Sequence, residues 1–311
     1  MKVLVTGGAG FIGANLCQSM LERAEISEVV VLDDLSTGSA TNLVGTDVTF
    51  VEGSILDRPL VDDLVGQVDA VVHLAARPSV PRSLADPVTS HLVNATGTLY
   101  VLEACRAAGA YVVAASSSSV YGSVIELPRH EELATRPLSP YAASKLATEA
   151  YVLAYATSFD LPTLAFRFFN VYGPLQAAGH AYAAVVPAFL DAALRGEPVQ
   201  VHGDGHQTRD FTYVGTLCEV LTDAVVRRVV SDAPVNLAFG ARVSLLSLID
   251  HMSAQLGTVI PVEHGPVRRG DVRDSQASNG RLRSLFPDVR PVPLEIGLKR
   301  TLDWFRAGAA S

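Results

Sequence analysis

The sequence predicts an α/β protein in which a doubly wound parallel sheet is followed by a smaller C-terminal α/β domain. Short β-branched runs alternate with helical patterns, which is typical of a parallel sheet with helices on both faces. The run at residues 2–6 leads into a glycine-rich turn and then into a helical pattern. Of the 311 residues, 49% are hydrophobic and 18% are charged, so the chain can bury a sizeable core.

Short apolar runs, mostly β-branched, predict the parallel strands of the first half. We expect these strands at 2–6, 28–32, 48–51, 69–74, 111–115 and 163–168. Helical patterns follow the glycine-rich turn as far as residue 21 and recur at 60–65, 92–108 and 141–155.

Three glycines, Gly7, Gly10 and Gly13, stand between the first strand and the first helix. In a dinucleotide-binding turn the first glycine permits the tight turn, the second lets the backbone approach a pyrophosphate, and the third lets helix and strand pack closely. The free N–H groups of the helix start then face the phosphates. A glycine triplet alone is weak evidence, but this position between strand and helix is the confirming context. We therefore expect a Rossmann-type domain.

Asp33 ends the second strand, 20 residues after Gly13. An acidic side chain at this distance holds the 2′-OH of the adenine ribose. Because a carboxylate there repels a 2′-phosphate, NAD is favoured over NADP as cofactor. The alternative interpretation of Asp33 is a solvated strand end.

Four serines, at residues 116–119, follow the fifth predicted strand and precede Val120-Tyr121-Gly122. The carboxyl ends of parallel strands are where such sheets bind ligands. The serines are therefore candidates for substrate contact, although a polar turn would have the same composition.

A tyrosine and a lysine, Tyr141 and Lys145, share one face of the helix that Ser139 and Pro140 begin. A free tyrosine has a pKa of about 10 and is a poor base at neutral pH. A lysine one turn away, together with a cationic cofactor ring, would favour the phenolate. A shift of about 3 units corresponds to roughly 4 kcal/mol and would make Tyr141 a general base for a hydroxyl. The alternative is a chance pair at helical spacing.

The second half of the chain loses the regular alternation, and we expect the NAD-binding domain at 1–172 and a substrate domain at 173–311, with boundaries that can interleave. Helices are expected at 185–194, 217–230, 245–256 and 294–305, and strands at 198–201, 211–214 and 234–237. Two arginines in this half, Arg209 and Arg268, could clamp a diphosphate with their guanidinium forks. The alternative is that both are surface arginines.

Composition excludes several classes of protein. The net charge is −8 with scattered Lys and Arg, which argues against nucleic acid and anionic membrane surfaces as partners. The uncharged run 168–190 contains Pro174 and Pro187 and is not expected to span a membrane. Three widely separated cysteines match no metal or redox spacing, no leader peptide is expected, and a reducing, cytoplasmic location is the simplest expectation.

Together these residues resemble the extended short-chain dehydrogenase/reductase family, and within it the nucleotide-sugar epimerases. The resemblance covers essentially the whole chain. Its most specific parts are residues 6–13, residues 116–122 followed by Tyr141-x-x-x-Lys145, and the sequences at 167–174 and 203–211. The sequences at 73–76 and 79–83 are most similar to the branch of UDP-glucose and UDP-N-acetylglucosamine 4-epimerases.

The resemblance implies NAD-dependent epimerisation at C4 of a UDP-hexose through a transient 4-keto sugar. Tyr141 would take the 4-OH proton while NAD⁺ accepts hydride, Lys145 would bind the nicotinamide ribose and lower the Tyr141 pKa, and Ser117 would hold the C4 oxygen. The residues implied to bind NAD are Gly7, Gly10, Phe11, Ile12, Gly13, Asp33, Asp34, Ser36, Gly38, Ser54, Ile55, Leu74, Ala75, Ala76, Asn94, Tyr141, Lys145 and Phe168. Those implied to bind the UDP-sugar are Ser79, Ser117, Ser118, Ser119, Tyr141, Asn170, Val186, Arg209, Arg268, Asp271 and Ser275.

Departures from related enzymes narrow the substrate. Dehydratases of the family usually carry Asp-Glu where this chain has Ser118-Ser119, so dehydration is disfavoured. UDP-glucuronate 4-epimerases usually carry Thr at Asn170 and an arginine shortly after; neither is present here, although His180 could meet a carboxylate. A small residue at Ser275 favours a pocket that also admits a 2-acetamido group.

A further departure concerns the cofactor. Many relatives carry Asp at Ser54, near the adenine amino group, and a serine hydroxyl there would weaken NAD binding slightly.

Several alternatives remain open at this point. They are a UDP-glucuronate 4-epimerase or decarboxylase, another nucleotide-sugar oxidoreductase or dehydratase, and a nucleotide-sensing or scaffold protein on the same fold. The last is disfavoured because Tyr141 and Lys145 are both present. The helices at 92–108 and 141–155 have apolar faces beyond what one sheet face needs, and family members often pair them, so we expect a homodimer.

Overall fold

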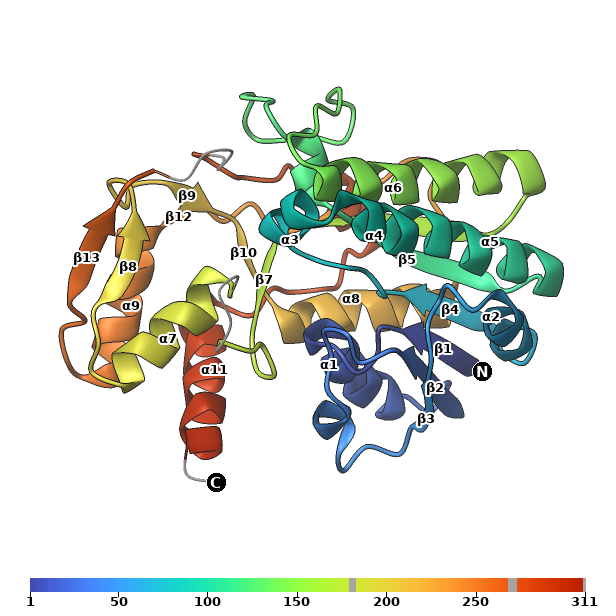
Figure 1. The fold of residues 1–311 in the computed structure, drawn as a ribbon, viewed down its shortest axis with the longest axis horizontal. Helices are drawn as coiled ribbons and strands as arrows, with labels where there is room; N and C mark the ends of the chain where they lie inside the picture. Colours follow the sequence, from blue (N-terminus) through green and yellow to red (C-terminus); the bar gives the residue numbers. More distant parts are fainter. Residues whose placement is uncertain (179–182, 268–272, 310–311) are drawn as a thin grey trace.

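The structure is a computed structural model that describes residues 1–178, 183–267 and 273–309. Its centre is a seven-stranded parallel sheet with the order β11-β6-β5-β4-β1-β2-β3 (Figure 1). The strands are β1 (Lys2–Thr6), β2 (Glu28–Asp33), β3 (Thr49–Glu52), β4 (Ala70–His73), β5 (Tyr111–Ser117), β6 (Thr163–Phe168) and β11 (Val235–Leu237). The predicted α/β fold with a parallel sheet is confirmed.

The strand order reverses at the middle of the sheet. Val3 of β1 lies opposite Val29 of β2 on one side and opposite Ala70 of β4 on the other. The connections after β1 and β4 therefore leave the sheet in opposite directions. In open parallel sheets, the crevice at such a reversal, at the carboxyl ends of the strands, is where ligands bind.

Helices cover both faces of the sheet because successive side chains of each strand point to opposite sides. Val3 and Val5 belong to the core on the side of α1 (Phe11–Leu21) and α8 (Val214–Arg227). Leu4, between them in sequence, belongs to the other core, which α2 (Arg58–Val65), α5 (Gly97–Ala108) and α6 (Pro140–Phe159) cover.

The second lobe lies beside the carboxyl ends of the strands (Figure 1). It contains three strand pairs: β7 (Asn170–Tyr172) with β10 (Phe211–Tyr213), β9 (Thr208–Arg209) with β12 (Val243–Ser244), and β8 (Val199–His202) with β13 (Val262–Gly265). Its helices include α7 (Val185–Leu194), α9 (Leu245–Leu256) and α11 (Leu294–Ala309).

Two segments of the second half return to the large sheet. Strand β11 pairs with β6, and α8 packs on α1. The chain is thus interleaved between the lobes, and the division into domains at residues 172 and 173 stays a prediction.

Most predicted elements are present with small shifts at their ends, and α7 and α9 have the predicted bounds. The predicted helix at 92–108 is corrected: residues Leu92–Thr96 form a π-helical turn, and α5 begins at Gly97. Two short helices, α3 (Val80–Ala85) and α4 (Pro87–His91), were not predicted, nor were β13 and α10 (Gly280–Leu285).

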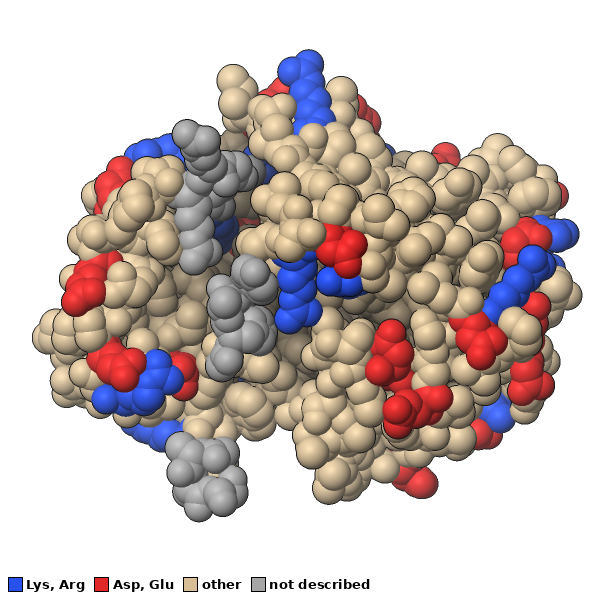
Figure 2. Space-filling view, viewed as in Figure 1, with Lys and Arg blue, Asp and Glu red and all other residues tan. Residues whose placement is uncertain are grey.

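Surface charge, the cysteines and helix length each bear on the expectations from composition. Lys, Arg, Asp and Glu are scattered over the face drawn in Figure 2, without one large basic patch among the described residues. Cys17, Cys105 and Cys218 are all buried free thiols. Within the described ranges, every helix is too short or too polar to cross a membrane.

Candidate active site

The glycine-rich turn leaves no room for side chains. Gly7 has a φ of +74°, and a Cβ there would lie 2.7 Å from the backbone nitrogen of Ala75. A Cβ on Gly13 would lie 2.3 Å from the carbonyl oxygen of Gly7. Gly10 is the N-cap of α1, and no side chain caps this helix. The turn is therefore a bare cradle at a helix start, and it fits the pyrophosphate of a dinucleotide.

Asp33 braces this turn from the end of β2. Its Oδ2 accepts a hydrogen bond from the Ala9 N–H at 3.0 Å, and its Oδ1 accepts one from the Leu35 N–H at 2.9 Å. Burial raises the pKa of Asp33, while the two backbone donors act in the opposite direction. The neighbouring Asp34 accepts from the Ser36 backbone at 3.0 Å. Asp33 is thus held in a buried setting rather than at a solvated strand end.

Other predicted cofactor residues line the same edge of the sheet. Gly38 lies against the turn, since a Cβ there would be 2.8 Å from the carbonyl carbon of Ala9. Ser54 accepts from the Leu56 N–H at 3.2 Å, and Ile55 is buried against Gly97. The turns after β1, β2 and β4 are therefore in close contact, since Gly7 lies against Ala75 and Gly38 lies against Ala9. Their individual contacts with a cofactor stay predictions.

Asn94 has a structural task that the sequence did not indicate. Its side chain accepts from the Arg77 N–H at 2.7 Å, donates to the Arg77 carbonyl at 3.3 Å and donates to the Ser144 hydroxyl at 2.9 Å. It thereby ties the loop after β4 to α6. The π-helical turn that carries Asn94 is a form often found at functional sites.

Tyr141, Lys145 and Ser117 come together where α6 begins beside the end of β5. Ser139 caps α6 as predicted, accepting from the Ala142 N–H at 3.1 Å. Lys145 Nζ donates to the Ala115 carbonyl of β5 at 2.9 Å. Tyr141 is hydrogen-bonded with Ser117, and Ser119 Oγ donates to Ser117 Oγ at 2.9 Å. These contacts bring Tyr141, Lys145 and Ser117 together, and their catalytic roles stay predictions.

The pKa shifts at this triad bear on the expected phenolate, which was assigned from the sequence to Lys145 together with a cationic cofactor ring. Burial raises the pKa of Tyr141, and hydrogen bonding with Ser117 lowers it by a smaller amount. Burial also lowers the pKa of Lys145 to about 8. Lys145 alone therefore does not make Tyr141 a phenolate at neutral pH. The lowering requires a second positive charge beside the phenol, which the nicotinamide ring of NAD⁺ carries.

A neutral histidine lies beneath the triad. His73 Nδ1 is 2.8 Å from Thr6 Oγ1, and His73 Nε2 is 3.0 Å from Thr98 Oγ1. Burial first, and the charge of Lys145 second, lower the His73 pKa to about 3. His73 therefore links β1, β4 and α5 without adding charge near Lys145. From the sequence, His73 is identified only as part of the motif at residues 73–76, which does not indicate this structural role.

Three of the predicted substrate residues, Asn170, Arg209 and Ser275, lie close together on the second lobe. Asn170 Nδ2 donates to the Asp210 carbonyl at 3.3 Å, and Arg209 donates to the carbonyls of Thr208 and Arg273 at 2.9 and 3.1 Å. The Ser275 N–H donates to the Thr208 carbonyl at 3.1 Å, so Ser275 lies beside this arginine.

The remaining predicted substrate residues can be placed individually. Val186 is buried on α7, and Ser79 caps α3 with a strained φ of +92°. Arg268 and Asp271, and also His180, lie outside the described residues.

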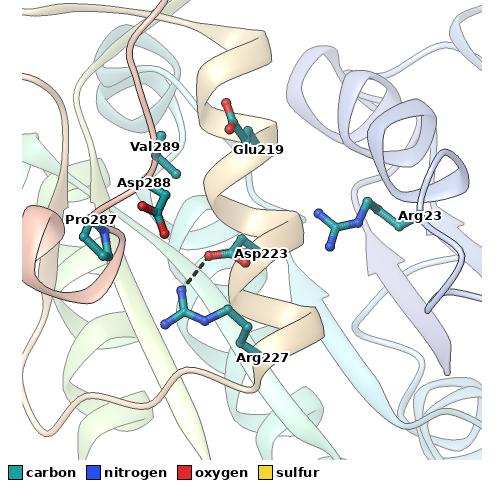
Figure 3. A pocket seen from close by; sticks show the side chains of 7 residues that line it. All are labelled: Arg23, Glu219, Asp223, Arg227, Pro287, Asp288 and Val289. Carbon is teal, nitrogen blue, oxygen red and sulfur yellow. Dashed lines mark hydrogen bonds and ion pairs between the residues drawn. The ribbon is translucent and has the colours of Figure 1, made fainter.

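One surface pocket can be set aside as an active site. It lies between the end of α1, α8 and residues 287–289, and its lining includes Arg23, Asp223 and Arg227 (Figure 3). Asp223 is paired with Arg227 at 2.6 Å. The glycine-rich turn is at the opposite end of α1, so this pocket is remote from the cradle and the triad.

Three comparisons with known proteins all point to the same family. The model of the "NAD dependent epimerase/dehydratase family" matches residues 3–238. A UDP-glucose 4-epimerase of Mycolicibacterium smegmatis is 37% identical, over 98% of this chain and 99% of that protein. A dTDP-glucose 4,6-dehydratase of Streptomyces niveus is 31% identical, over 100% of this chain and 94% of that protein. The solved UDP-N-acetylglucosamine 4-epimerase of Methanobrevibacter ruminantium, in complex with UDP-N-acetylmuramic acid, superimposes with a TM-score of 0.92 at 32% identity, covering 99% of this chain and 98% of that chain.

Proposed function

The chain belongs to the NAD-dependent epimerase/dehydratase family, and on this premise we propose that it is a UDP-hexose 4-epimerase. Its substrates would be the pair UDP-glucose and UDP-galactose, together with UDP-N-acetylglucosamine and UDP-N-acetylgalactosamine. NAD is the cofactor of this family, and the bare glycine cradle braced by Asp33 fits it.

One observation carries the choice of epimerisation over dehydration. The phenol of Tyr141 is hydrogen-bonded with Ser117, whose hydroxyl accepts from Ser119, and the two residues after Ser117 are serines rather than an acid and a base. A dehydratase must also protonate a leaving hydroxyl and remove a second proton, which requires an acid and a base at these positions. Ser118 and Ser119 can orient a sugar but supply neither group at neutral pH.

Bound NAD supplies a two-electron acceptor that takes a hydride from a carbinol carbon and can return it. In our proposal, Tyr141 removes the proton from the 4-OH and later gives it back, while Ser117 holds the same oxygen by hydrogen bonding. Lys145 keeps a positive charge near the phenol. This charge stabilises the phenolate form that the proton transfer requires.

The grip on the substrate would be divided. Asn170, Arg209, Arg268 and Asp271 would hold the UDP part, where arginine forks match diphosphate oxygens. Few polar groups would hold the hexose itself, so the 4-keto sugar can turn over before it is reduced on its other face. Ser275 would leave space for a 2-acetamido group.

We also propose the assembly and location of the enzyme. Tyr151 and Phe159 of α6 are 39% and 50% exposed, and Leu92 and Val88 are 42% and 67% exposed. A second copy packed on α6, on α4 and on the π-helical turn before α5 would bury such side chains in a two-fold homodimer. Light scattering after gel filtration should give twice the monomer mass. Three free thiols fit the reducing cytoplasm.

The experiment that tests the proposed function is a substrate panel. Purified protein is incubated separately with UDP-glucose, UDP-N-acetylglucosamine, UDP-glucuronate and dTDP-glucose, and the products are followed by ¹H NMR. We expect the C4 epimers of the two neutral UDP-sugars. A 4-keto-6-deoxy sugar would identify a dehydratase, a pentose a decarboxylase, and UDP-galacturonate a uronate epimerase. Any of these as the main product would contradict the proposal.

A further inference from the structure

We propose that Glu149, paired with Arg167, is a positioning residue that holds the base helix α6 at the distance from β5 that catalysis needs. The inference rests on the proposed function, because it assigns Glu149 a task for the same Tyr141 and Lys145. Neither Glu149 nor Arg167 is one of the groups to which we assign contact with cofactor or substrate.

Glu149 makes three short polar contacts inside the protein. Its Oε1 accepts from Arg167 Nη2 at 2.7 Å and its Oε2 accepts from Arg167 Nε at 2.9 Å, so the pair is bidentate. Its Oε2 also accepts from the Ser116 hydroxyl at 2.7 Å. The side chains of Glu149 and Arg167 are each only 4% exposed.

The position of Glu149 along α6 connects it to the triad. Glu149 follows Lys145 by one helical turn, and Ser116 directly precedes Ser117 on β5. Lys145 is bound to the Ala115 carbonyl, and Glu149 is bound to the Ser116 hydroxyl. Two residues of α6 that are one turn apart, Lys145 and Glu149, therefore bind two successive residues of β5, Ala115 and Ser116.

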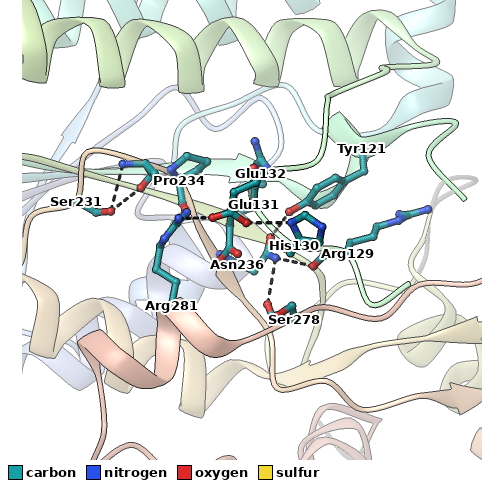
Figure 4. Close-up of polar contacts among 12 residues, drawn as sticks. Tyr121, Arg129, His130, Glu131, Glu132, Ser231, Pro234, Asn236, Ser278 and Arg281 are labelled. Carbon is teal, nitrogen blue, oxygen red and sulfur yellow. Dashed lines mark hydrogen bonds and ion pairs between the residues drawn. The ribbon is translucent and has the colours of Figure 1, made fainter. Parts of the chain in front are cut away.

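Arg167 links this pair to the loop after β5 and, through the Tyr121 ring, to the edge strand β11 of the large sheet. It donates to the Glu131 carbonyl at 3.3 Å, and its guanidinium carbon is 4.7 Å from the centre of the Tyr121 ring. The Tyr121 hydroxyl donates to Asn236 Oδ1 at 2.7 Å, and Asn236 Nδ2 donates to the Ser278 carbonyl at 3.2 Å (Figure 4).

A buried ion pair contributes little net stability to a fold, because removing two charges from water opposes their mutual attraction. Apolar side chains of similar volume often stabilise as well or better, whereas loss of one charged partner is strongly destabilising. What the pair provides here is a defined position for α6. The bidentate contact with Arg167 and the bond from Ser116 fix the helix both along and across β5. A displacement of about 1 Å at a reacting group can cost about 100-fold in rate.

The test separates positioning from stability with three variants of the NAD-loaded enzyme. Glu149→Gln leaves Arg167 without its countercharge, and the double variant Glu149→Leu/Arg167→Met replaces the pair by apolar side chains. Val152→Ala is the matched control. Val152 is fully buried on the same helix, so its truncation lowers stability, but its side chain takes no part in the polar contacts of Glu149. Stability is measured by urea unfolding, and turnover by NMR.

We expect kcat to fall by about 10- to 100-fold in Glu149→Gln with KM changed by less than about threefold. The double variant should recover the urea midpoint of unfolding but not kcat, and Val152→Ala should lose stability and keep kcat. Recovery of both kcat and stability in the double variant, or an equal loss of kcat in Val152→Ala, would overturn the inference.

A readout without turnover keeps this test independent of the proposed function. The ionisation of Tyr141 is titrated by phenolate absorbance, as the difference between each NAD-loaded protein and its Tyr141→Phe counterpart. We expect the Tyr141 pKa to rise by about one unit in Glu149→Gln and in the double variant, since Lys145 is no longer held in place. An unchanged Tyr141 pKa in both variants would refute positioning. If instead no UDP-sugar is turned over by the unaltered protein, the proposed function fails while this titration still decides the role of Glu149.

Discussion

The ammonium of Lys145 donates a 2.9 Å hydrogen bond to the backbone carbonyl of Ala115, two residues before Ser117 on the same strand. Lys145 is nearly buried, and this bond partly offsets the loss of its hydration. The bond also fixes the first turns of α6 beside the end of β5. The contact between Lys145 and Ala115 therefore holds the phenol of Tyr141 close to the hydroxyl of Ser117, although neither of these two groups takes part in it.

The glycine turn gives the first prediction, which concerns the cofactor. Gly13→Ala should weaken NAD binding by about 5- to 150-fold, because a Cβ 2.3 Å from the Gly7 carbonyl oxygen would force the turn apart at a cost of about 1–3 kcal/mol. NAD affinity is measured by calorimetry on protein stripped of nucleotide. Gly280→Ala is the control, since a Cβ there meets no atom within 4 Å. Equal affinities for the two variants would show that the turn does not cradle the cofactor.

Ser275 gives the second prediction, which concerns substrate choice. Ser275→Tyr should reduce kcat/KM for UDP-N-acetylglucosamine relative to UDP-glucose by about 10- to 100-fold, because a bulky ring would occupy the space of the acetamido group. Ser275→Ala should leave the ratio as it is. Both ratios are measured in direct competition by NMR. If Ser275→Tyr also leaves the ratio unchanged, Ser275 does not gate the pocket.

Asp210 gives the third prediction, which concerns pH. Asp210 is fully buried and accepts from the Gly240 and Ala277 N–H groups, each at 3.0 Å. Burial raises its pKa from 3.8 to about 6, and these backbone donors offset only part of the effect. A raised carboxyl pKa gives a stabilising contribution that is complete below pH 3.8 and is lost as the pH rises through about 6.

The comparison for Asp210 is its amide variant. Between pH 4 and pH 7, the unfolding free energy of the unaltered protein should fall by about 2 kcal/mol relative to Asp210→Asn. Urea unfolding at several pH values measures this difference. Curves that stay parallel across the window would mean that Asp210 titrates normally despite its burial.

Local patterns were sufficient for the parts of the site that are local. The glycine turn, the Ser139 cap and the spacing of Tyr141 and Lys145 each lie within a few residues, so periodicity and capping rules could place them. The caps of the unpredicted α3 and α4, Ser79 and Asp86, were also present in the sequence, as residues preceding Val80-Pro81 and Pro87. Stricter use of those capping rules could have found both helices.

Contacts between distant segments could not be predicted in this way. Arg167 and Glu149 meet only because β6 lies beside β5 and α6 packs over both, and nothing near either residue indicates the other. The tasks of His73 and Asn94 likewise depend on partners from other elements. The pKa of Tyr141 depends on burial, which the spacing of a dyad does not reveal.

The central claim is that the phenol of Tyr141 is the base of a C4 epimerase, and Tyr141→Phe tests it most directly. The rate of interconversion of UDP-glucose and UDP-galactose is measured by NMR for both proteins, with the NAD content of each determined on the same sample. We predict a fall in kcat of about 100- to 10,000-fold while bound NAD is retained. Full activity in the phenylalanine variant would contradict the account.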